Sequence, residues 1–326
     1  MSAEITIGLN AAIFAVTGEE PRILTVDEGG PQRRGRTTPR PALPFGPLDP
    51  RGDRTLELGL RGWVREQADL ELGYVEQLYT FGDRDRQANA SGAARVLSIA
   101  YLALLREDES PASGAQWHDV YAFLPWEDWR RGRPQLVDRV LIPRLASWAR
   151  EEARLESHRT ERVEIAFGSG GAKWDEERVL DRYELLYEGG LIAEARDDDG
   201  KQVERASRRS DRNDRGLPMA LDHRRILATA LGRLRGKLKY RPVVFELLPP
   251  SFTLLQLQRV VEALAGIPLH KQNFRRLVEK GGLVEGTGKL EMQTGGRPAE
   301  LFAFRREVLH ERPTPGVGLP GLPAER

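Results

Sequence analysis

Short apolar runs alternate with amphipathic stretches over the first 160 residues of the chain. In residues 56–70 the apolar positions 56, 60, 63, 64 and 70 follow a helical rhythm, with Glu and Arg between them. A longer amphipathic helix is predicted within residues 135–158, with an interruption near Pro143. The predicted strands are residues 5–7, 11–16, 22–26, Tyr74–Phe81, 96–105 and 117–124. Strands that alternate with helices predict an α/β or α+β domain over residues 1–160.

Residues 161–221 combine a helical pattern with a polar stretch. Residues 174–188 (WDEERVLDRYELLYE) predict a helix with Val179 and Tyr183 on one face, and Gly189-Gly190 is typical of a helix end. Residues 197–216 (DDDGKQVERASRRSDRNDRG) are dense in charge and poor in apolar side chains, as mobile linkers are. This segment therefore predicts a helical connector that includes a charged linker.

Three successive helices are predicted after residue 221. Asp222 is placed to cap the first and Thr253 the second, which Gly266 ends. A four-residue turn then leads to a short third helix that begins after His270. Two helices joined by such a turn are typical of a helix-turn-helix unit. The predicted helices are residues 222–239, Leu254–Ala265 and Lys271–Lys280.

The third helix has one apolar face and one polar face. Phe274, Leu277 and Val278 fall together at spacings of three and four, so we expect them to face the core. Gln, Asn and Arg side chains make bidentate contacts with base edges in the major groove of DNA. The outward residues expected to contact DNA are Lys271, Gln272, Asn273, Arg275 and Arg276. A basic surface helix on an oligomerisation domain is the alternative interpretation.

A glycine-rich hairpin follows the third helix. The strands predicted at residues 283–284 and 300–304 enclose Lys289 and Arg297. Such a hairpin is a wing, whose basic side chains can reach phosphate groups or a minor groove. The combined pattern predicts a winged helix DNA-binding domain over residues 222–310, followed by a flexible tail over 311–326.

The charge is nearly balanced overall but unevenly distributed. The chain carries 50 Lys and Arg against 49 Asp and Glu, whereas residues 223–307 hold 16 basic and 7 acidic residues. A basic segment joined to an acidic one favours nucleic acid as a partner of the basic segment. The absence of cysteine excludes disulfides and cysteine-ligated zinc, and no apolar run approaches the ~18 residues that span a bilayer. We expect a cytoplasmic protein without a membrane partner.

The segment from Asp222 to Phe304, which includes GIPLHKQNFRRLVEKGGLVEGTG, closely resembles the winged helix of the NadQ and NrtR-type regulators of NAD metabolism. These regulators are related to Nudix hydrolases. LPFGPLDP at residues 43–50 resembles a Nudix phosphate loop, and YVEQLYTFGDRDR at residues 74–86 resembles the strand after a Nudix helix. The resemblance implies a degenerate Nudix-fold domain before the connector. It also implies a homodimer on a palindromic double-stranded DNA operator, repression of genes of NAD synthesis or salvage, and NAD, ADP-ribose or ATP as the regulatory ligand.

The Nudix hydrolase motif, G-x5-E-x7-R-E-U-x-E-E-x-G-U with U an apolar residue, is only partly present. With Val64 and Leu70 on the U positions, the upstream glutamate becomes Arg54, the R-E pair Gly62-Trp63, the E-E pair Glu66-Gln67, and the late glycine Asp69. Only Glu66 remains among the glutamates that hold Mg²⁺ in such hydrolases. Since Mg²⁺ needs several oxygen ligands, we expect neither a metal site nor catalytic residues here.

A domain without the metal site can still bind a nucleotide. Guanidinium groups bind diphosphates bidentately, and several arginines precede the phosphate-like loop. The residues expected to contact the ligand are Arg36, Arg40, Phe45 and Phe81. Solvated arginines and buried phenylalanines are the alternative for these four positions.

We expect no cofactor beyond the regulatory nucleotide. Two other functions remain open from the sequence alone. One is an active Nudix hydrolase of a nucleoside diphosphate derivative, fused to a nucleic-acid-binding domain. The other is an RNA-binding module, because winged helices also bind RNA.

Overall fold

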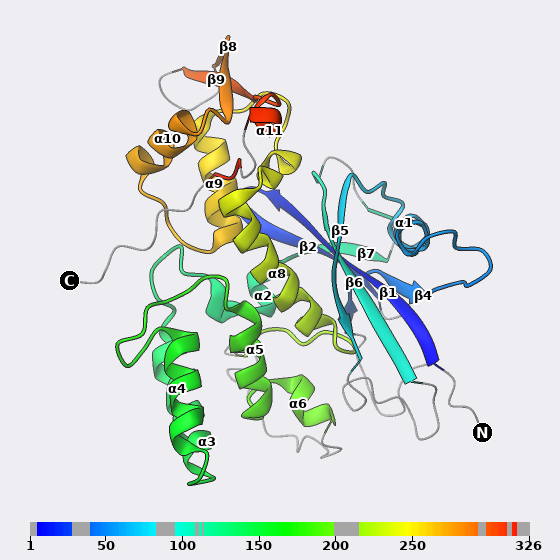
Figure 1. Ribbon diagram of the computed structural model, residues 1–326, viewed down its shortest axis with the longest axis vertical. Helices are drawn as coiled ribbons and strands as arrows, with labels where there is room; N and C mark the ends of the chain where they lie inside the picture. The colour runs from blue at the N-terminus through cyan, green and yellow to red at the C-terminus, as the bar shows by residue number, and fades with distance from the viewer. Residues whose placement is uncertain are drawn as a thin grey trace.

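The computed structural model describes residues 5–27, 40–82, 95–107, 111–112, 114–198, 215–292, 298–311 and 315–317. A twisted sheet lies on one side of the molecule and a group of helices on the other, with the winged helix at the top of the view in Figure 1. No helix in these ranges is both long enough and apolar enough to cross a lipid bilayer.

Strand β1 (Ile5–Thr17) lies at the centre of a seven-stranded sheet. It pairs antiparallel with β2 and β4 and parallel with β6, while β5 pairs with β6 and both β3 and β7 pair with β2. The separate strands expected at residues 5–7 and 11–16 are wrong, because Gly8 and Asn10 continue one ladder opposite Ser98 and Ala100. The other strands are β2 (Glu20–Asp27), β3 (Pro41–Ala42), β4 (Phe45–Pro47), β5 (Tyr74–Phe81), β6 (Arg95–Leu104) and β7 (Ala115–Asp119).

The strand expected at residues 117–124 ends early. Strand β7 stops at Asp119, whose carboxylate accepts a hydrogen bond from the Tyr121 amide at 2.9 Å. This contact caps the short helix α2 (Val120–Phe123), as Asp commonly does at a helix start. Residues 120–123 are therefore helical rather than extended.

The helices after residue 135 are shorter than the pattern predicts. The helix expected at residues 135–158 divides into η2 (Val137–Leu141), α3 (Ile142–Arg150), which has proline in its first turn, and α4 (Glu156–Phe167). Helix α5 covers only Val179–Glu188 of the helix expected at 174–188, and Trp174 instead stacks on Trp129 with ring centroids 3.9 Å apart. A short helix, α6 (Ala193–Asp198), was not expected. Residues 199–214 of the expected linker lie outside the described residues.

The three helices expected after residue 221 are all present, as α8 (His223–Tyr240), α9 (Leu254–Ala265) and α10 (Lys271–Lys280). Thr253 caps α9 as expected: its hydroxyl accepts from the Gln256 amide at 3.1 Å, and the Gln256 side chain accepts from the Thr253 amide at 2.7 Å. Asp222 occupies the cap position of α8, but its carboxylate pairs with Arg225 at 3.2 Å instead of a helix amide. The remaining elements are α1 (Leu56–Ala68), η1 (Pro125–Glu127), η3 (Val243–Leu247), β8 (Val284–Glu291), β9 (Ala299–Phe304) and α11 (Val308–Glu311).

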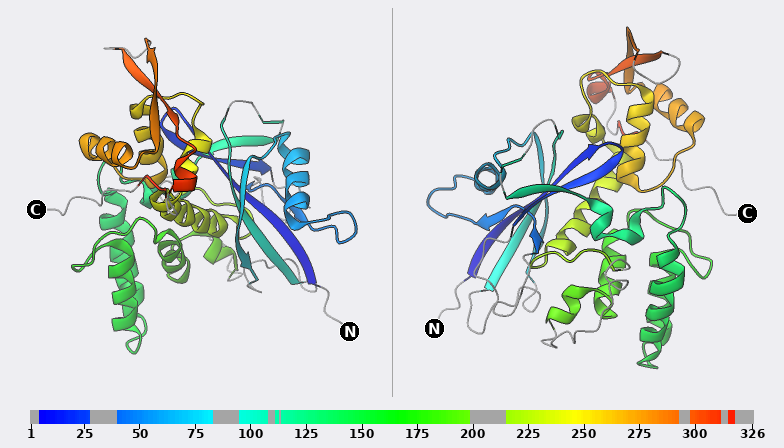
Figure 2. Two further views of the ribbon diagram at one scale, coloured as in Figure 1. Left: turned by 45° about the horizontal axis from the view of Figure 1, so that its top comes forward. Right: turned by 180° about the vertical axis from the view of Figure 1, so that it is seen from behind.

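Helix α8 packs against the sheet, the connector and the winged helix at once. It contacts β5 and β6 along one side, α5 on another, and α9 and η3 toward its end (Figure 2). One continuous apolar core consequently contains Leu102 of the sheet, Leu186 of α5, Leu231 of α8 and Phe274 of α10. The winged helix is thus packed against the rest of the protein along α8.

A buried carboxylate joins three parts of this packing. Glu127 of η1 pairs with Arg182 of α5 (Oε1 to Nε 2.6 Å) and with Arg235 of α8 (Oε2 to Nη1 2.6 Å). All three side chains are fully buried. Burial alone would raise the pKa of Glu127, but the two guanidinium groups outweigh this effect and hold the pKa below its usual value. Glu127 is therefore ionised in the folded protein.

We expect Glu127→Gln to lower the free energy of unfolding by about 3–5 kcal/mol, because it leaves two buried guanidinium groups without a counter-charge. Urea denaturation at neutral pH measures the loss. The matched control is Glu71→Gln, since Glu71 and its partner Arg65 are both exposed, at 75% and 61%. That variant should change stability by less than about 1 kcal/mol. Equal losses in the two variants would contradict the structural role of Glu127.

The first residue of α8 is a buried, neutral histidine. His223 Nδ1 accepts a hydrogen bond from the Leu43 amide at 2.9 Å, and burial lowers the pKa of His223 to about 3. In the unfolded chain His223 titrates near 6.5. Between these two values the unfolded state binds a proton that the folded state does not, so stability falls as the pH is lowered.

We expect His223→Asn to flatten this pH dependence, because the amide oxygen can accept from Leu43 without titrating. Between pH 6.5 and about pH 5 the natural protein should lose roughly 1.5 kcal/mol more stability than the variant. Urea unfolding of both proteins at the two pH values tests this. Identical losses would show that folding does not lower the pKa of His223.

Candidate functional site

Trp63 and Gln67 attach helix α1 to strand β4. The Gln67 side chain accepts from the Phe45 amide at 3.0 Å and donates to the Phe45 carbonyl at 2.7 Å. The Trp63 indole donates to the Pro47 carbonyl at 2.9 Å and covers Gly46, where a Cβ atom would lie 2.1 Å from the indole ring. Trp63 and Gln67 therefore hold residues 45–47 against α1.

The carboxylates near α1 do not converge. Glu57 pairs with Arg61 at 2.8 Å and Glu71 with Arg65 at 2.6 Å, while Glu66 is exposed. Asp69 ends the helix with φ 54°, a left-handed conformation that glycine usually supplies and that aspartate tolerates. Within the described ranges, no group of three or more His, Asp or Glu is arranged to hold a metal ion.

A small cavity lies where β1, β4 and β6 meet the start of α8. Its volume is about 190 Å³, and the ring of Phe45 lies edge-on to that of His223, with centroids 5.1 Å apart. The polar side chains on its wall are those of Thr6, Asn10, Ser98, Asp222 and His223. Apart from the Asp222 carboxylate, which pairs with Arg225, these groups are a neutral imidazole, hydroxyls and an amide, so the cavity is mainly a hydrogen-bonding site.

The expected ligand residues are only partly brought together. Phe45 lines the cavity, whereas Arg40 is half-buried just before β3 and does not line it. Phe81 is only 2% exposed and packs in the main core, with the guanidinium of Arg225 5.3 Å above its ring, so its position does not support contact with a ligand. Arg36 lies outside the described residues.

Sequence reasoning missed most of the cavity wall. Asn10 carried a usable signal, because a polar residue between apolar stretches of one strand is unusual and here it is only 3% exposed. His223 carried none, since its role depends on Leu43, which is 180 residues away in the chain.

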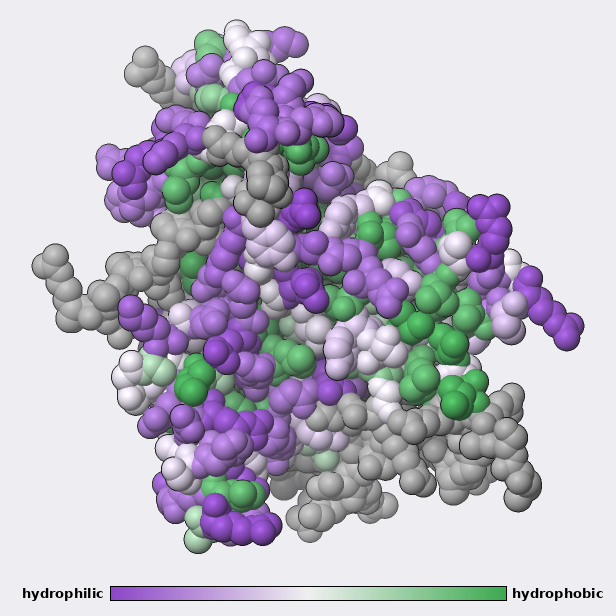
Figure 3. Space-filling view, viewed as in Figure 1, coloured by the Kyte–Doolittle hydropathy of each residue, from purple (hydrophilic) through white to green (hydrophobic). Residues whose placement is uncertain are grey.

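Helix α10 presents the expected polar face to solvent. Phe274 and Val278 are fully buried and Leu277 is half-buried, as the periodicity predicts. The side chains of Lys271, Gln272, Asn273, Arg275 and Arg276 are all exposed. Hydrophilic surface accordingly covers this helix at the upper left of Figure 3.

The two predicted wing residues differ in what the structure describes. Lys289 is exposed on β8, next to α10 in the chain. Arg297 lies outside the described residues. An exposed helix with Gln, Asn and Arg on its outer face, followed by a hairpin that exposes Lys289, has the geometry of a helix that enters a DNA groove with a flanking wing.

Comparison with known proteins identifies a family for the C-terminal part of the chain. Residues 244–304 match the family described as the NrtR DNA-binding winged helix domain. An ADPR responsive transcriptional repressor, NtrR, from Acinetobacter baylyi is 40% identical over 88 residues, which are 27% of this chain and 35% of the relative. The match therefore spans about a third of that relative.

Solved structures match over nearly the full length. NrtR from Shewanella oneidensis, solved alone and with a 27mer DNA, has a TM-score of 0.54 and 20% identity, covering 93% of this chain and 95% of that chain. A MutT/nudix family protein from Enterococcus faecalis has a TM-score of 0.51 and 14% identity, covering 94% and 88%. Residues 244–304 therefore form a winged helix domain of the NrtR type, and the chain as a whole has the fold of these NrtR and MutT/nudix structures.

Proposed function

We propose that this protein is a DNA-binding transcriptional repressor that senses an adenine nucleotide, ADP-ribose in the first instance, through a catalytically inactive Nudix-fold domain. The observation that carries the proposal is the exposed face of α10 in a segment that matches the NrtR DNA-binding domain. The name of the Acinetobacter baylyi relative favours ADP-ribose over NAD and ATP.

The sensing step rests on the cavity beside His223. At about 190 Å³ it is smaller than the roughly 300–1,000 Å³ of most small-molecule pockets, so a nucleotide has to enlarge it. Part of its wall is the start of α8, formed by Asp222, His223 and Ile226. Enlargement therefore displaces α8, and α8 carries that displacement toward α9 and η3. A ligand that binds the two arrangements with different affinity shifts the equilibrium between them.

The remaining parts of the proposal follow from the resemblance. The protein acts in the cytoplasm as a homodimer on a palindromic operator and represses genes of NAD synthesis or salvage. Half-sites of such operators lie about 34–36 Å apart or at a multiple of that distance. A modest rotation of the two winged helices is enough to break that match.

The DNA face is tested with the duplex that the natural protein selects from a random-sequence pool. We expect Arg276→Ala to cost roughly 1–3 kcal/mol in binding to this duplex and to relax the preference at one base pair, because Arg276 is placed to read a base edge. Lys289→Ala should instead weaken binding to the selected duplex and to random DNA by the same factor. It should also reduce the slope of the logarithm of the binding constant against the logarithm of the salt concentration by about one. Fluorescence anisotropy at several salt concentrations measures both effects.

Phe274→Ala is the structural control, since Phe274 is fully buried and its truncation should lower the melting temperature. If Arg276→Ala and Gln272→Ala both leave DNA affinity unchanged in folded protein, then α10 does not enter the groove. Tighter binding to a matched RNA duplex would instead favour the RNA-binding alternative.

Catalysis is tested separately from binding. We expect no Mg²⁺-dependent hydrolysis of ADP-ribose or NADH near the ~1–10³ s⁻¹ of ordinary enzymes, because Trp63 and Gln67 are engaged with β4 and Glu66 is the only motif glutamate left. Chromatography of reaction mixtures with pure protein measures turnover. Turnover in that range that Glu66→Gln abolishes would establish the hydrolase alternative.

A further inference from the structure

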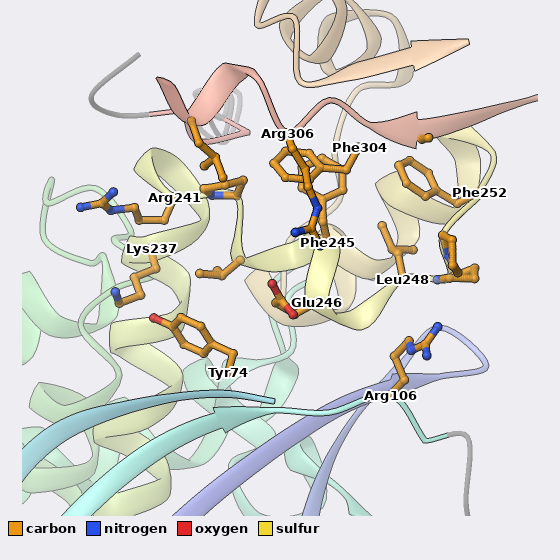
Figure 4. Close-up of a pocket in the computed structure, with 16 residues that line it drawn as sticks. Tyr74, Arg106, Lys237, Arg241, Phe245, Glu246, Leu248, Phe252, Phe304 and Arg306 are labelled. Atoms are coloured by element: carbon orange, nitrogen blue, oxygen red, sulfur yellow. The ribbon is translucent and has the colours of Figure 1, made fainter. Parts of the chain in front are cut away.

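A second, larger cleft lies at the opposite end of α8 from the His223 cavity. Its volume is about 770 Å³, and it opens between the sheet and the winged helix (Figure 4). Tyr74 and Arg106 line it from the sheet side, and Phe245 and Phe304 from the winged helix side. Lys237, which also lines it, is 14 residues beyond His223, so the two sites are about 21 Å apart along the helix.

Cationic side chains surround this cleft. Four of them line it, Arg106, Lys237, Arg241 and Arg306, against the single carboxylate of Glu246. Lys237 already pairs with Glu76 at 2.5 Å. Within the described part of the chain, Arg241 and Arg306 make neither a side-chain hydrogen bond nor an ion pair. Two arginines from different elements are thus available to an anion in a concave site, where like charges reinforce one another.

The winged-helix side of the cleft has aromatic rings beside the cations. Phe245 and Phe304 stack on each other with centroids 4.3 Å apart, and Arg306 follows Phe304 by two residues. In Figure 4 the Arg306 side chain passes these rings and reaches down toward Glu246. The cleft volume falls within the roughly 300–1,000 Å³ of small-molecule sites, which favours a compact ligand.

We propose that this cleft is a second effector site and that it takes a polyphosphate anion, such as the phosphate chain of a nucleotide. The planar guanidinium groups of Arg241 and Arg306 match the oxygens of a phosphate chain, with Lys237 and Arg106 completing the charge. The cleft lies away from α10, because α10 and α11 lie on opposite sides of α9 (Figures 1 and 2).

Occupancy of the cleft has a mechanical consequence. An anion held by Arg106 of the sheet side and Arg306 of the winged helix bridges two parts of the protein that α8 joins. It fixes their relative position and therefore changes DNA affinity from a site distinct from the ADP-ribose cavity.

The test uses calorimetry of the full-length protein with inorganic tripolyphosphate as the probe. We expect saturable binding that weakens as salt is raised. The double variant Arg241→Ala/Arg306→Ala should bind about tenfold or more weakly. Glu246→Gln should bind more tightly, because it removes the one opposing charge. The control is Arg144→Ala, which removes one exposed arginine on α3, far from the cleft lining, and should leave binding unchanged.

Several results would overturn the proposal. These are no saturable binding by the natural protein, unchanged binding by the double variant with an unaltered melting temperature, or an equal loss in Arg144→Ala. Tripolyphosphate binding that the double variant retains and that ADP-ribose displaces would place the anion in the His223 cavity instead. If the double variant weakens DNA binding in the absence of any added anion, then Arg241 and Arg306 contact DNA phosphates, and the cleft is not an effector site.

Discussion

The buried contact of Glu127 with Arg182 and Arg235 determines how the parts of this protein fit together. Two cations and one anion share a site from which water is excluded, so carbonyl groups must satisfy the remaining donors. Arg235 accordingly donates to the Leu264 carbonyl near the end of α9 at 3.1 Å. Gly266, which follows α9, packs so closely against Arg235 that a Cβ atom would lie 2.4 Å from the guanidinium. The orientation of the winged helix is thereby tied to the connector.

Helix α8 connects the small cavity, this buried cluster and the larger cleft. It begins at the small cavity with His223, passes the buried cluster at Arg235, and reaches the larger cleft with Lys237 before it ends at Tyr240. Tightly packed helices shift as units between discrete arrangements. A change in the cavity at one end is therefore expected to alter the position of α9 and, with it, the exposed face of α10.

The winged helix was predictable from sequence because its signals are local. The capping box at Thr253, the glycine at residue 266 and the apolar spacing around Phe274 lie within a few residues of what they determine. The sheet side was less predictable, since Gln67 reveals its role only through a strand 22 residues earlier, and Glu127 through an arginine 108 residues later. The cavity wall could not be assigned for the same reason.

The central claim is that nucleotide binding and DNA binding are coupled through α8. The most direct test measures DNA affinity with and without saturating ADP-ribose, and ADP-ribose affinity with and without saturating DNA. Linkage requires the two ratios to be equal, and the account predicts a common factor in the range of about 5–150. A ratio of one in both directions, with each ligand binding on its own, would contradict the coupling.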